Sequence, residues 1–200
     1  MAWVKGVIFD LDGVIVENKL NFKKISIDIF GKEQFPLLER ILKIKDPSQR
    51  KRAYTILERY ETEAASICKL KEGIEELFDI LDRYEVKKGV VTRNCRKSVD
   101  LIMARFGIKF DVVVTREDAP PKPSKDSVVY ALRKLNLSPF ESILVGDYEF
   151  DMVAGKKAGV FTIFLKSSNH YTSRYADLTL ESIPQLSQYL KRIFEKEKVY

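Results

Sequence analysis

The chain has 200 residues, of which 45% are hydrophobic, and it carries a formal net charge of +6. This size supports one substantial core, or one core with a modest inserted domain. No apolar run approaches the ~20 residues of a membrane-spanning helix, and the N-terminus lacks a signal-peptide pattern, so we expect a cytoplasmic protein with no membrane partner. Two cysteines without a CxxC motif and a single histidine support neither a disulfide framework nor a zinc site.

The basic excess is modest, because most lysines and arginines are interleaved with acids, as on an ordinary solvated surface. The densest basic segment, Lys43 to Arg59, fits a charged helical face first and an anion-attracting surface second. No nucleic-acid-recognition motif accompanies it. We therefore expect no nucleic-acid partner.

In chain order, the first distinctive stretch is 4–14, with the sequence VKGVIFDLDGV. Its apolar run at 7–9 predicts a buried strand, and Asp10 and Asp12 follow where that strand would leave its sheet. In extended chain their Cα atoms lie roughly 7 Å apart on one side, so the two carboxylates can hold a hard cation and share nucleophile and proton-transfer roles. By itself the stretch fits an Asp/Gly turn equally well. An EF-hand loop fits less well, because Gly13 comes fourth instead of sixth.

Residues 17–71 predict a small helical insert of three or four segments. They show many charges, no strand-like run, and apolar residues at three- and four-residue spacing. Asp46-Pro47 interrupts the series before a further helical stretch from about Gln49 to Cys68. The alternative interpretation is that these residues form further helices of the core itself.

From Glu72 onward, helical and strand patterns alternate, with strands expected near 89–92, 111–115, 143–146 and 161–165. Helices are expected near 74–81, 99–106 (ended by Gly107), 124–135 (capped by Ser124), 152–158 and 183–195. Repeated strand–helix–strand units with apolar strands indicate an α/β fold with a doubly wound, Rossmann-like parallel sheet covered on both faces. Such sheets bind ligands beyond the carboxyl ends of their strands, near the point where the strand order reverses.

Polar side chains follow three of the expected strands and are candidates for this ligand site. They are Asp10 and Asp12 after the first strand, Thr92, Arg93 and Asn94 after the second, and Asp147 and Asp151 after the fourth. Lys122 lies between the last two groups, in a proline-rich stretch that predicts stiff, non-helical backbone.

Taken together, these fragments resemble the four motifs of the haloacid dehalogenase superfamily in order and spacing. The fragments are FDLDGV at 9–14, VVTRN at 90–94, Lys122-Pro123 and GDYEFD at 146–151. The resemblance implies that residues 1–16 and 72–200 form a Rossmann-like core. It also implies that residues 17–71 form a helical cap domain that closes over the site.

The resemblance further implies roles for the acids. Asp10 resembles the nucleophile, and Asp12 resembles the general acid that protonates the leaving oxygen and then activates water. Asp10 and Asp147 would bind Mg²⁺ through their side chains and Asp12 through its backbone carbonyl, in keeping with the oxygen ligands that Mg²⁺ prefers. Neighbouring carboxylates would raise the pKa of Asp12 while the metal and Lys122 would lower it, so the sequence leaves the direction open.

The remaining implied roles concern the phosphate group. Lys122 resembles the lysine that pairs with phosphate and nucleophile, and the Thr92 hydroxyl resembles a donor to a phosphate oxygen. Arg93 and Asn94 resemble residues that line the phosphate pocket, and Asp151 would support the metal and the lysine. Taken singly, Lys122 fits a surface lysine, Thr92 a strand-end turn residue, and Asp151 a helix-start charge.

The sequence departs from the family pattern at two points. Tyr148 stands where many relatives carry a small residue, and Lys-Pro-Ser-Lys at 122–125 replaces the more common Lys-Pro-x-Pro. Within the insert, Lys45 and Arg50 are candidates for substrate contact on charge alone.

The activity implied by the resemblance is that of a Mg²⁺-dependent phosphatase for a small phosphorylated metabolite, acting through an aspartyl-phosphate intermediate. Phosphoglycolate phosphatase-like activity is the leading named candidate. The alternatives are a sugar phosphomutase of the same superfamily and a non-catalytic regulatory protein that retains the fold. We expect a monomer or a homodimer.

Overall fold

The computed structural model describes residues 4–17, 20–166 and 172–196; parts of the expected core and residues 18–19 of the insert lie outside these ranges. Within them, six parallel strands form one sheet in the order β3-β2-β1-β4-β5-β6. The strands are β1 (Gly6–Phe9), β2 (Lys87–Val91), β3 (Val112–Val114), β4 (Ser142–Gly146), β5 (Phe161–Leu165) and β6 (Leu178–Leu180). This order confirms the predicted doubly wound, Rossmann-like α/β fold.

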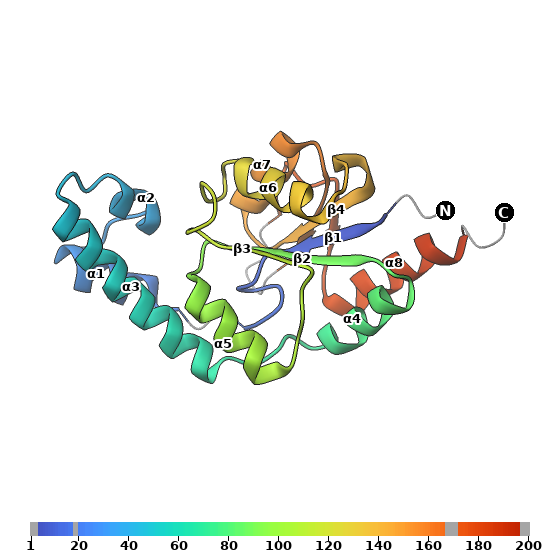
Figure 1. Ribbon diagram of the computed structural model, residues 1–200, viewed down its shortest axis with the longest axis horizontal. Helices are drawn as coiled ribbons and strands as arrows, with labels where there is room; N and C mark the ends of the chain where they lie inside the picture. Colours follow the sequence, from blue (N-terminus) through green and yellow to red (C-terminus); the bar gives the residue numbers. More distant parts are fainter. Residues whose placement is uncertain (1–3, 18–19, 167–171, 197–200) are drawn as a thin grey trace.

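Helices cover both faces of the sheet (Figure 1). Alternate residues of β1 face opposite layers, so Val7 and Phe9 pack in one apolar cluster and Ile8 in the other. The helices on one face are α6 (Asp126–Leu135) and α7 (Glu149–Ala158), and those on the other are α4 (Ile74–Arg83), α5 (Arg96–Phe106) and α8 (Ile183–Lys196).

No helix in the described ranges combines the length and apolar character needed to cross a membrane.

The ends of two core helices test the predicted caps. Gly107 ends α5 in the left-handed conformation, with φ of 64°, as predicted. The prediction that Ser124 caps α6 is wrong by one residue, because Lys125 holds that position. The Ser124 hydroxyl instead closes a turn just before the helix, where its Oγ atom accepts the Asp126 N–H at 3.3 Å.

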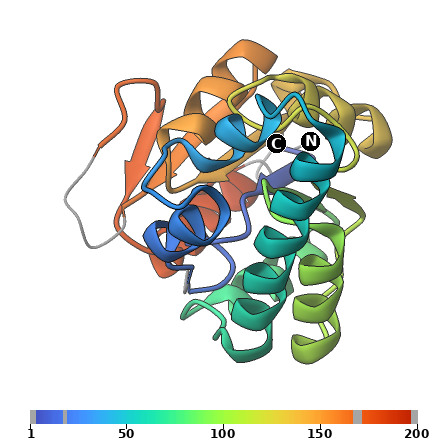
Figure 2. The same ribbon diagram turned by 90° about the vertical axis from the view of Figure 1, so that its left-hand side faces the viewer.

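The described part of the insert contains three helices, which share an apolar cluster of their own. They are α1 (Phe22–Phe30), α2 (Leu37–Leu42) and α3 (Pro47–Ile67), and the cluster consists of Ile25, Leu37, Leu38, Ile41, Ala53 and Leu57. In Figure 1 these helices lie at one end of the molecule, and Figure 2 shows them from that end, in front of the sheet.

The two segments that connect the insert to the core lie side by side. The Glu17 N–H donates to the Lys69 carbonyl at 2.9 Å, and the Lys71 N–H donates to the Ile15 carbonyl at 2.9 Å. The chain therefore leaves and re-enters the core through one hydrogen-bonded pair of segments, which form an isolated antiparallel bridge between Val16 and Leu70.

Candidate active site

The candidate site lies where the strand order reverses. β2 and β3 extend from one side of β1, and β4, β5 and β6 extend from the other. Asp10 directly follows β1, Asp147 directly follows β4, and Thr92 directly follows β2. The carboxyl ends of these three neighbouring strands thus place the sequence-predicted residues around the crevice in which doubly wound sheets bind ligands.

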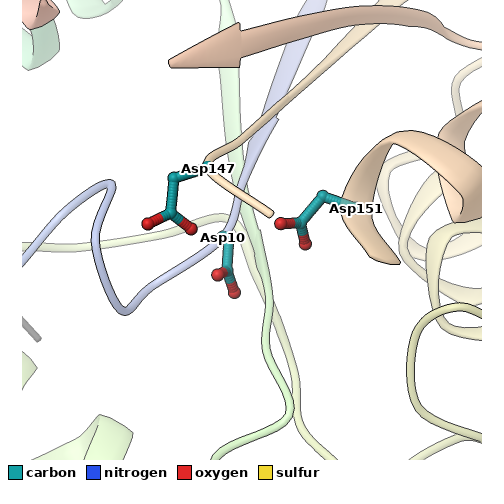
Figure 3. Close-up of side chains that lie close together, drawn as sticks. All are labelled: Asp10, Asp147 and Asp151. Carbon is teal, nitrogen blue, oxygen red and sulfur yellow. The ribbon is translucent and has the colours of Figure 1, made fainter. Parts of the chain in front are cut away.

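Three carboxylates converge in this crevice (Figure 3). One oxygen from each of Asp10, Asp147 and Asp151 lies within 4.8 Å of the other two. Asp151 is fixed at the start of α7, where its Oδ2 atom accepts the Tyr148 N–H at 3.1 Å. Gly13 has φ of 85°, and a Cβ atom at this position would collide with the Asp147 carboxylate. Glycine is therefore required for the close approach of the first motif to Asp147.

A buried lysine neutralises part of this cluster. The Lys122 side chain is 1% exposed, and its Nζ atom lies 2.7 Å from Asp10 Oδ1 and 2.5 Å from Asp151 Oδ1. Burial lowers the pKa of Lys122, but the charges of Asp10 and Asp151 outweigh burial and raise it above its ordinary value. The alternative interpretation of Lys122 as a surface lysine is therefore wrong.

Lys122 supplies one positive charge to a cluster of three carboxyl groups, so negative charge remains in excess. Burial, followed by the charges of Asp10 and Asp151, raises the pKa of Asp147 to about 8. Burial also raises the pKa of Asp151 to about 6, although Lys122 opposes it. Buried carboxylates that repel one another in this way supply the charge and the oxygen donors of a site for a hard divalent cation. The donor set thus fits Mg²⁺.

Asp12 faces the same crevice and is held by Asn94. The Asn94 side-chain amide donates to Asp12 Oδ2 at 3.0 Å. Burial first, and then the charge of Asp10, raises the pKa of Asp12 to about 7, while the Asn94 hydrogen bond and Lys122 oppose the shift. In the metal-free chain, burial and Asp10 therefore outweigh Lys122 and Asn94. A carboxyl group that titrates near neutral pH suits both proton donation and proton abstraction.

Thr92 is 2% exposed and lies at the floor of the crevice. Its Oγ1 atom accepts the backbone N–H of Asn94 at 3.1 Å. This hydrogen bond uses the hydroxyl oxygen as an acceptor, so the hydroxyl hydrogen remains available to donate to a ligand.

Arg93 is already paired with an acid of the insert. Its guanidinium makes a bidentate pair with Glu39 of α2, at 2.8 and 2.9 Å. It also lies 4.8 Å from the centre of the Phe150 ring and donates to the Lys122 carbonyl. Burial raises the pKa of Glu39, but the Arg93 hydrogen bonds and charge outweigh burial and lower it. Glu39 is therefore ionised, and the sequence offered no signal that it faces Arg93.

A second ion pair joins the insert to the core. Arg116 Nη1 lies 2.5 Å from Glu61 Oε1, and the two side chains are only 5% and 4% exposed. Glu61 Oε2 accepts the Cys95 N–H at 3.3 Å, and the Ser98 hydroxyl donates to the Glu61 carbonyl at 3.2 Å. Burial raises the pKa of Glu61 despite Arg116, whereas Glu61 outweighs burial and raises the pKa of Arg116.

Sequence reasoning missed this pair, although two signals point to it. Glu61 continues a series of buried residues at four-residue spacing on α3, after Ala53 and Leu57, and an acid on an apolar helix face needs a buried partner. Arg116 is the second residue after β3, as Arg93 is the second residue after β2.

A cavity of about 540 Å³ lies between the strand ends and the insert. The candidates Lys45 and Arg50 are not among the residues that line it. The core contributes Asp10, Asp12, Thr92, Arg93, Asn94, Asp147, Tyr148 and Phe150, and the insert contributes Leu20, Phe22, Phe35, Pro36, Leu37, Leu38, Leu57 and Glu61.

Known proteins resemble this chain in sequence and in fold. The chain is 31% identical to a putative pyrophosphatase PpaX of Caldanaerobacter subterraneus subsp. tengcongensis, over 82% of this chain and 83% of the relative. It shares its fold with a predicted phosphoglycolate phosphatase of Haemophilus somnus (TM-score 0.74, 21% identity, 95% and 99% covered). It also shares it with a β-phosphoglucomutase of Clostridium difficile (TM-score 0.78, 18% identity, 98% and 100% covered).

The family model described as haloacid dehalogenase-like hydrolase matches residues 7–165, a span that contains all four motifs and the whole insert. The chain therefore belongs to the haloacid dehalogenase-like hydrolase family.

Proposed function

We propose that the protein is a Mg²⁺-dependent phosphatase that hydrolyses a small phosphorylated metabolite through an aspartyl-phosphate on Asp10. The observation that carries this proposal is the environment of Asp10. Its carboxylate is held by the buried Lys122, lies beside Asp147, and shares the cavity floor with Asp12, whose pKa is about 7. Membership of a hydrolase family and a relative named as a pyrophosphatase support phosphoryl chemistry.

The reaction begins when an oxygen of Asp10 attacks phosphorus. An Asp10 O–P bond forms as the bond to the leaving oxygen breaks, and the Asp12 carboxyl gives its proton to that oxygen. The Asp12 carboxylate then takes a proton from a water molecule, which attacks phosphorus and releases phosphate, so both side chains return to their starting states.

The other residues of the floor orient the groups that react. Lys122 holds Asp10 through Oδ1 and offers charge to the phosphate, while the Thr92 hydroxyl donates to a phosphate oxygen. Asp151 keeps Lys122 in place through a 2.5 Å ion pair. The side chains of Asp10 and Asp147 and the backbone carbonyl of Asp12 would hold Mg²⁺, which would neutralise charge as the Asp10 carboxylate approaches the phosphate.

The helical insert, residues 17–71, acts in this proposal as a cap over the site. The apolar cluster formed by α1, α2 and the first half of α3 is separate from those of the core, and the linking segments are paired. Both features support movement of this part of the insert about the segment of α3 that Glu61 anchors to the core. Closure of such a cap excludes water and completes the substrate site.

Phosphoglycolate is the named substrate that the sequence resemblance favours, and one structural neighbour carries that name. Pyrophosphate is a second candidate, because relatives are named as pyrophosphatases. A sugar phosphomutase is the alternative reaction, since a β-phosphoglucomutase shares the fold. The two reactions can be told apart by measurement, because a phosphatase releases phosphate whereas a mutase interconverts sugar phosphates without releasing it.

The test is phosphate release from a panel of phosphorylated metabolites with and without Mg²⁺. We expect turnover that requires Mg²⁺, is lost in Asp10→Asn, and is retained in Asp100→Asn, which makes the same chemical change at an exposed position of α5. Full activity of Asp10→Asn would overturn the proposal. Metal binding without turnover of any ester would favour the non-catalytic alternative.

A further inference from the structure

The cavity above Asp10 is polar at one end only. The reacting groups form its floor, whereas the insert lines it with seven apolar residues and Glu61. Glu61 is committed to Arg116 and to the Cys95 N–H. On the core side, Tyr148 and Phe150 extend the apolar lining, with their rings edge to face and their centres 5.1 Å apart. The part of a substrate that lies beyond its phosphate therefore meets carbon surface.

The lining offers no unpaired positive charge for a second anion. Among the described residues that line the cavity, Arg93 is the one cation. Both ends of its guanidinium fork are taken by the Glu39 carboxylate. A carboxylate or second phosphate that pairs with Arg93 would have to displace Glu39 or share the guanidinium with it, and like charges brought together in this way are strongly disfavoured.

Exposed aromatic rings gather at the same cavity. Phe22, Phe35 and Tyr148 line it and remain 43%, 42% and 57% exposed. Large apolar side chains left in water around a concave site mark a surface that an apolar ligand covers. A cavity of about 540 Å³ also falls in the range of sites for organic ligands much larger than phosphate.

The geometry points to a phosphate monoester of an uncharged aromatic alcohol as the substrate class, with Glu39 as the residue that excludes esters carrying a second anion. This inference rests on the proposed phosphatase activity and narrows it. The aromatic group lies against Phe22, Phe35 and Tyr148, the phosphorus lies over Asp10, and the ester oxygen faces Asp12 on the side of phosphorus away from Asp10. The inference makes phosphoglycolate a poor substrate, because its carboxylate finds no unpaired cation among the described residues that line the cavity.

A matched pair of substrates tests the inference. The probes are 2-phenylethyl phosphate and 3-phosphooxypropionate, two primary alkyl phosphates of similar length. The first ends in a phenyl ring and the second in a carboxylate. We expect kcat/KM to favour the phenyl ester by at least about tenfold, within the range of discrimination that an apolar pocket supplies. A preference for the carboxylate ester would overturn the inference.

Two variants separate the contributions of charge and apolar lining. Glu39→Gln frees the Arg93 guanidinium, so we expect it to raise kcat/KM for 3-phosphooxypropionate about tenfold relative to the phenyl ester, because a bidentate arginine–carboxylate pair becomes available. Phe22→Ala is expected to lower kcat/KM for the phenyl ester by a larger factor than that for the carboxylate ester. Glu33→Gln is the control, since it removes the same charge from an exposed position of the insert.

The outcomes distinguish this inference from the proposed function. Release of phosphate from neither probe nor from the wider panel would overturn both. Release with no preference, or a preference that Glu39→Gln and Phe22→Ala leave unchanged, would overturn the substrate class alone and leave the phosphatase in place.

Discussion

Arg116→Met is the change that most directly probes how the insert is joined to the core. It removes the positive partner of Glu61 and leaves a carboxylate buried at 4% exposure. Breaking a buried ion pair from one side typically costs about 3–5 kcal/mol, because the remaining charge is uncompensated. For a chain of this size that loss corresponds to a fall of about 6–20 °C in Tm.

The stability lost in Arg116→Met should increase as pH rises. Burial already raises the pKa of Glu61 in the folded chain, and the variant lacks the guanidinium that opposes this shift. Between the unfolded and the folded pKa of Glu61, the folded chain binds more protons than the unfolded chain, so its stability falls as pH rises. We therefore expect the deficit of Arg116→Met to be small near pH 5 and larger at pH 8.

Urea unfolding followed by circular dichroism at both pH values measures this deficit. Lys191→Met is the matched control, because it breaks the Glu76–Lys191 pair, whose side chains are 62% and 38% exposed, and exposed pairs contribute only about 0–1 kcal/mol. The free energy of unfolding that Arg116→Met loses should exceed the loss in the control. A loss no larger than in the control, or one that grows toward acid pH, would show that Arg116 does not stabilise the buried charge of Glu61.

Three further predictions concern the site itself. Gly13→Ala forces a side chain into left-handed backbone, which costs about 1–2 kcal/mol, and pushes it against Asp147, so calorimetry should show weaker Mg²⁺ binding. Gly31→Ala has the same backbone strain in open space, and an equal loss of Mg²⁺ affinity there would contradict the steric explanation. Asn94→Ala removes the hydrogen bond that lowers the pKa of Asp12; kcat should fall about tenfold and the pH profile should move toward alkaline pH, whereas an unmoved profile would exclude this role. Lys122→Met should reduce kcat at least about 10²-fold in the phosphate-release assay, and a near-normal rate would show that this cation is dispensable.

Much of the core could be predicted because its strands are apolar runs with clear boundaries. Asp10, Thr92 and Asp147 follow such runs directly, so the topology alone brings them to one edge of the sheet. β6 escaped prediction, since Leu178–Leu180 is a half-buried three-residue edge strand with too few residues to show a pattern.

The contacts between insert and core could not be predicted, because they join residues far apart in sequence. Arg93 was expected to line a phosphate pocket on the basis of its position and charge, and only the folded chain shows Glu39 opposite it. Likewise, charge alone does not indicate which residues of the insert face the cavity. Lys45 lies between α2 and α3 and Arg50 lies near the start of α3, whereas the insert lines the cavity with apolar residues and Glu61.

Detection of a phosphoryl group on Asp10 tests the proposed aspartyl-phosphate mechanism most directly. The enzyme is quenched in acid during turnover, digested, and examined by mass spectrometry for a hydroxylamine-sensitive phosphoryl group. We expect this group on Asp10 in the wild-type protein and in Asp100→Asn, and its absence in an inactive Asp10→Asn. Steady phosphate release by Asp10→Asn, or a phosphoryl group on another residue, would contradict this mechanism.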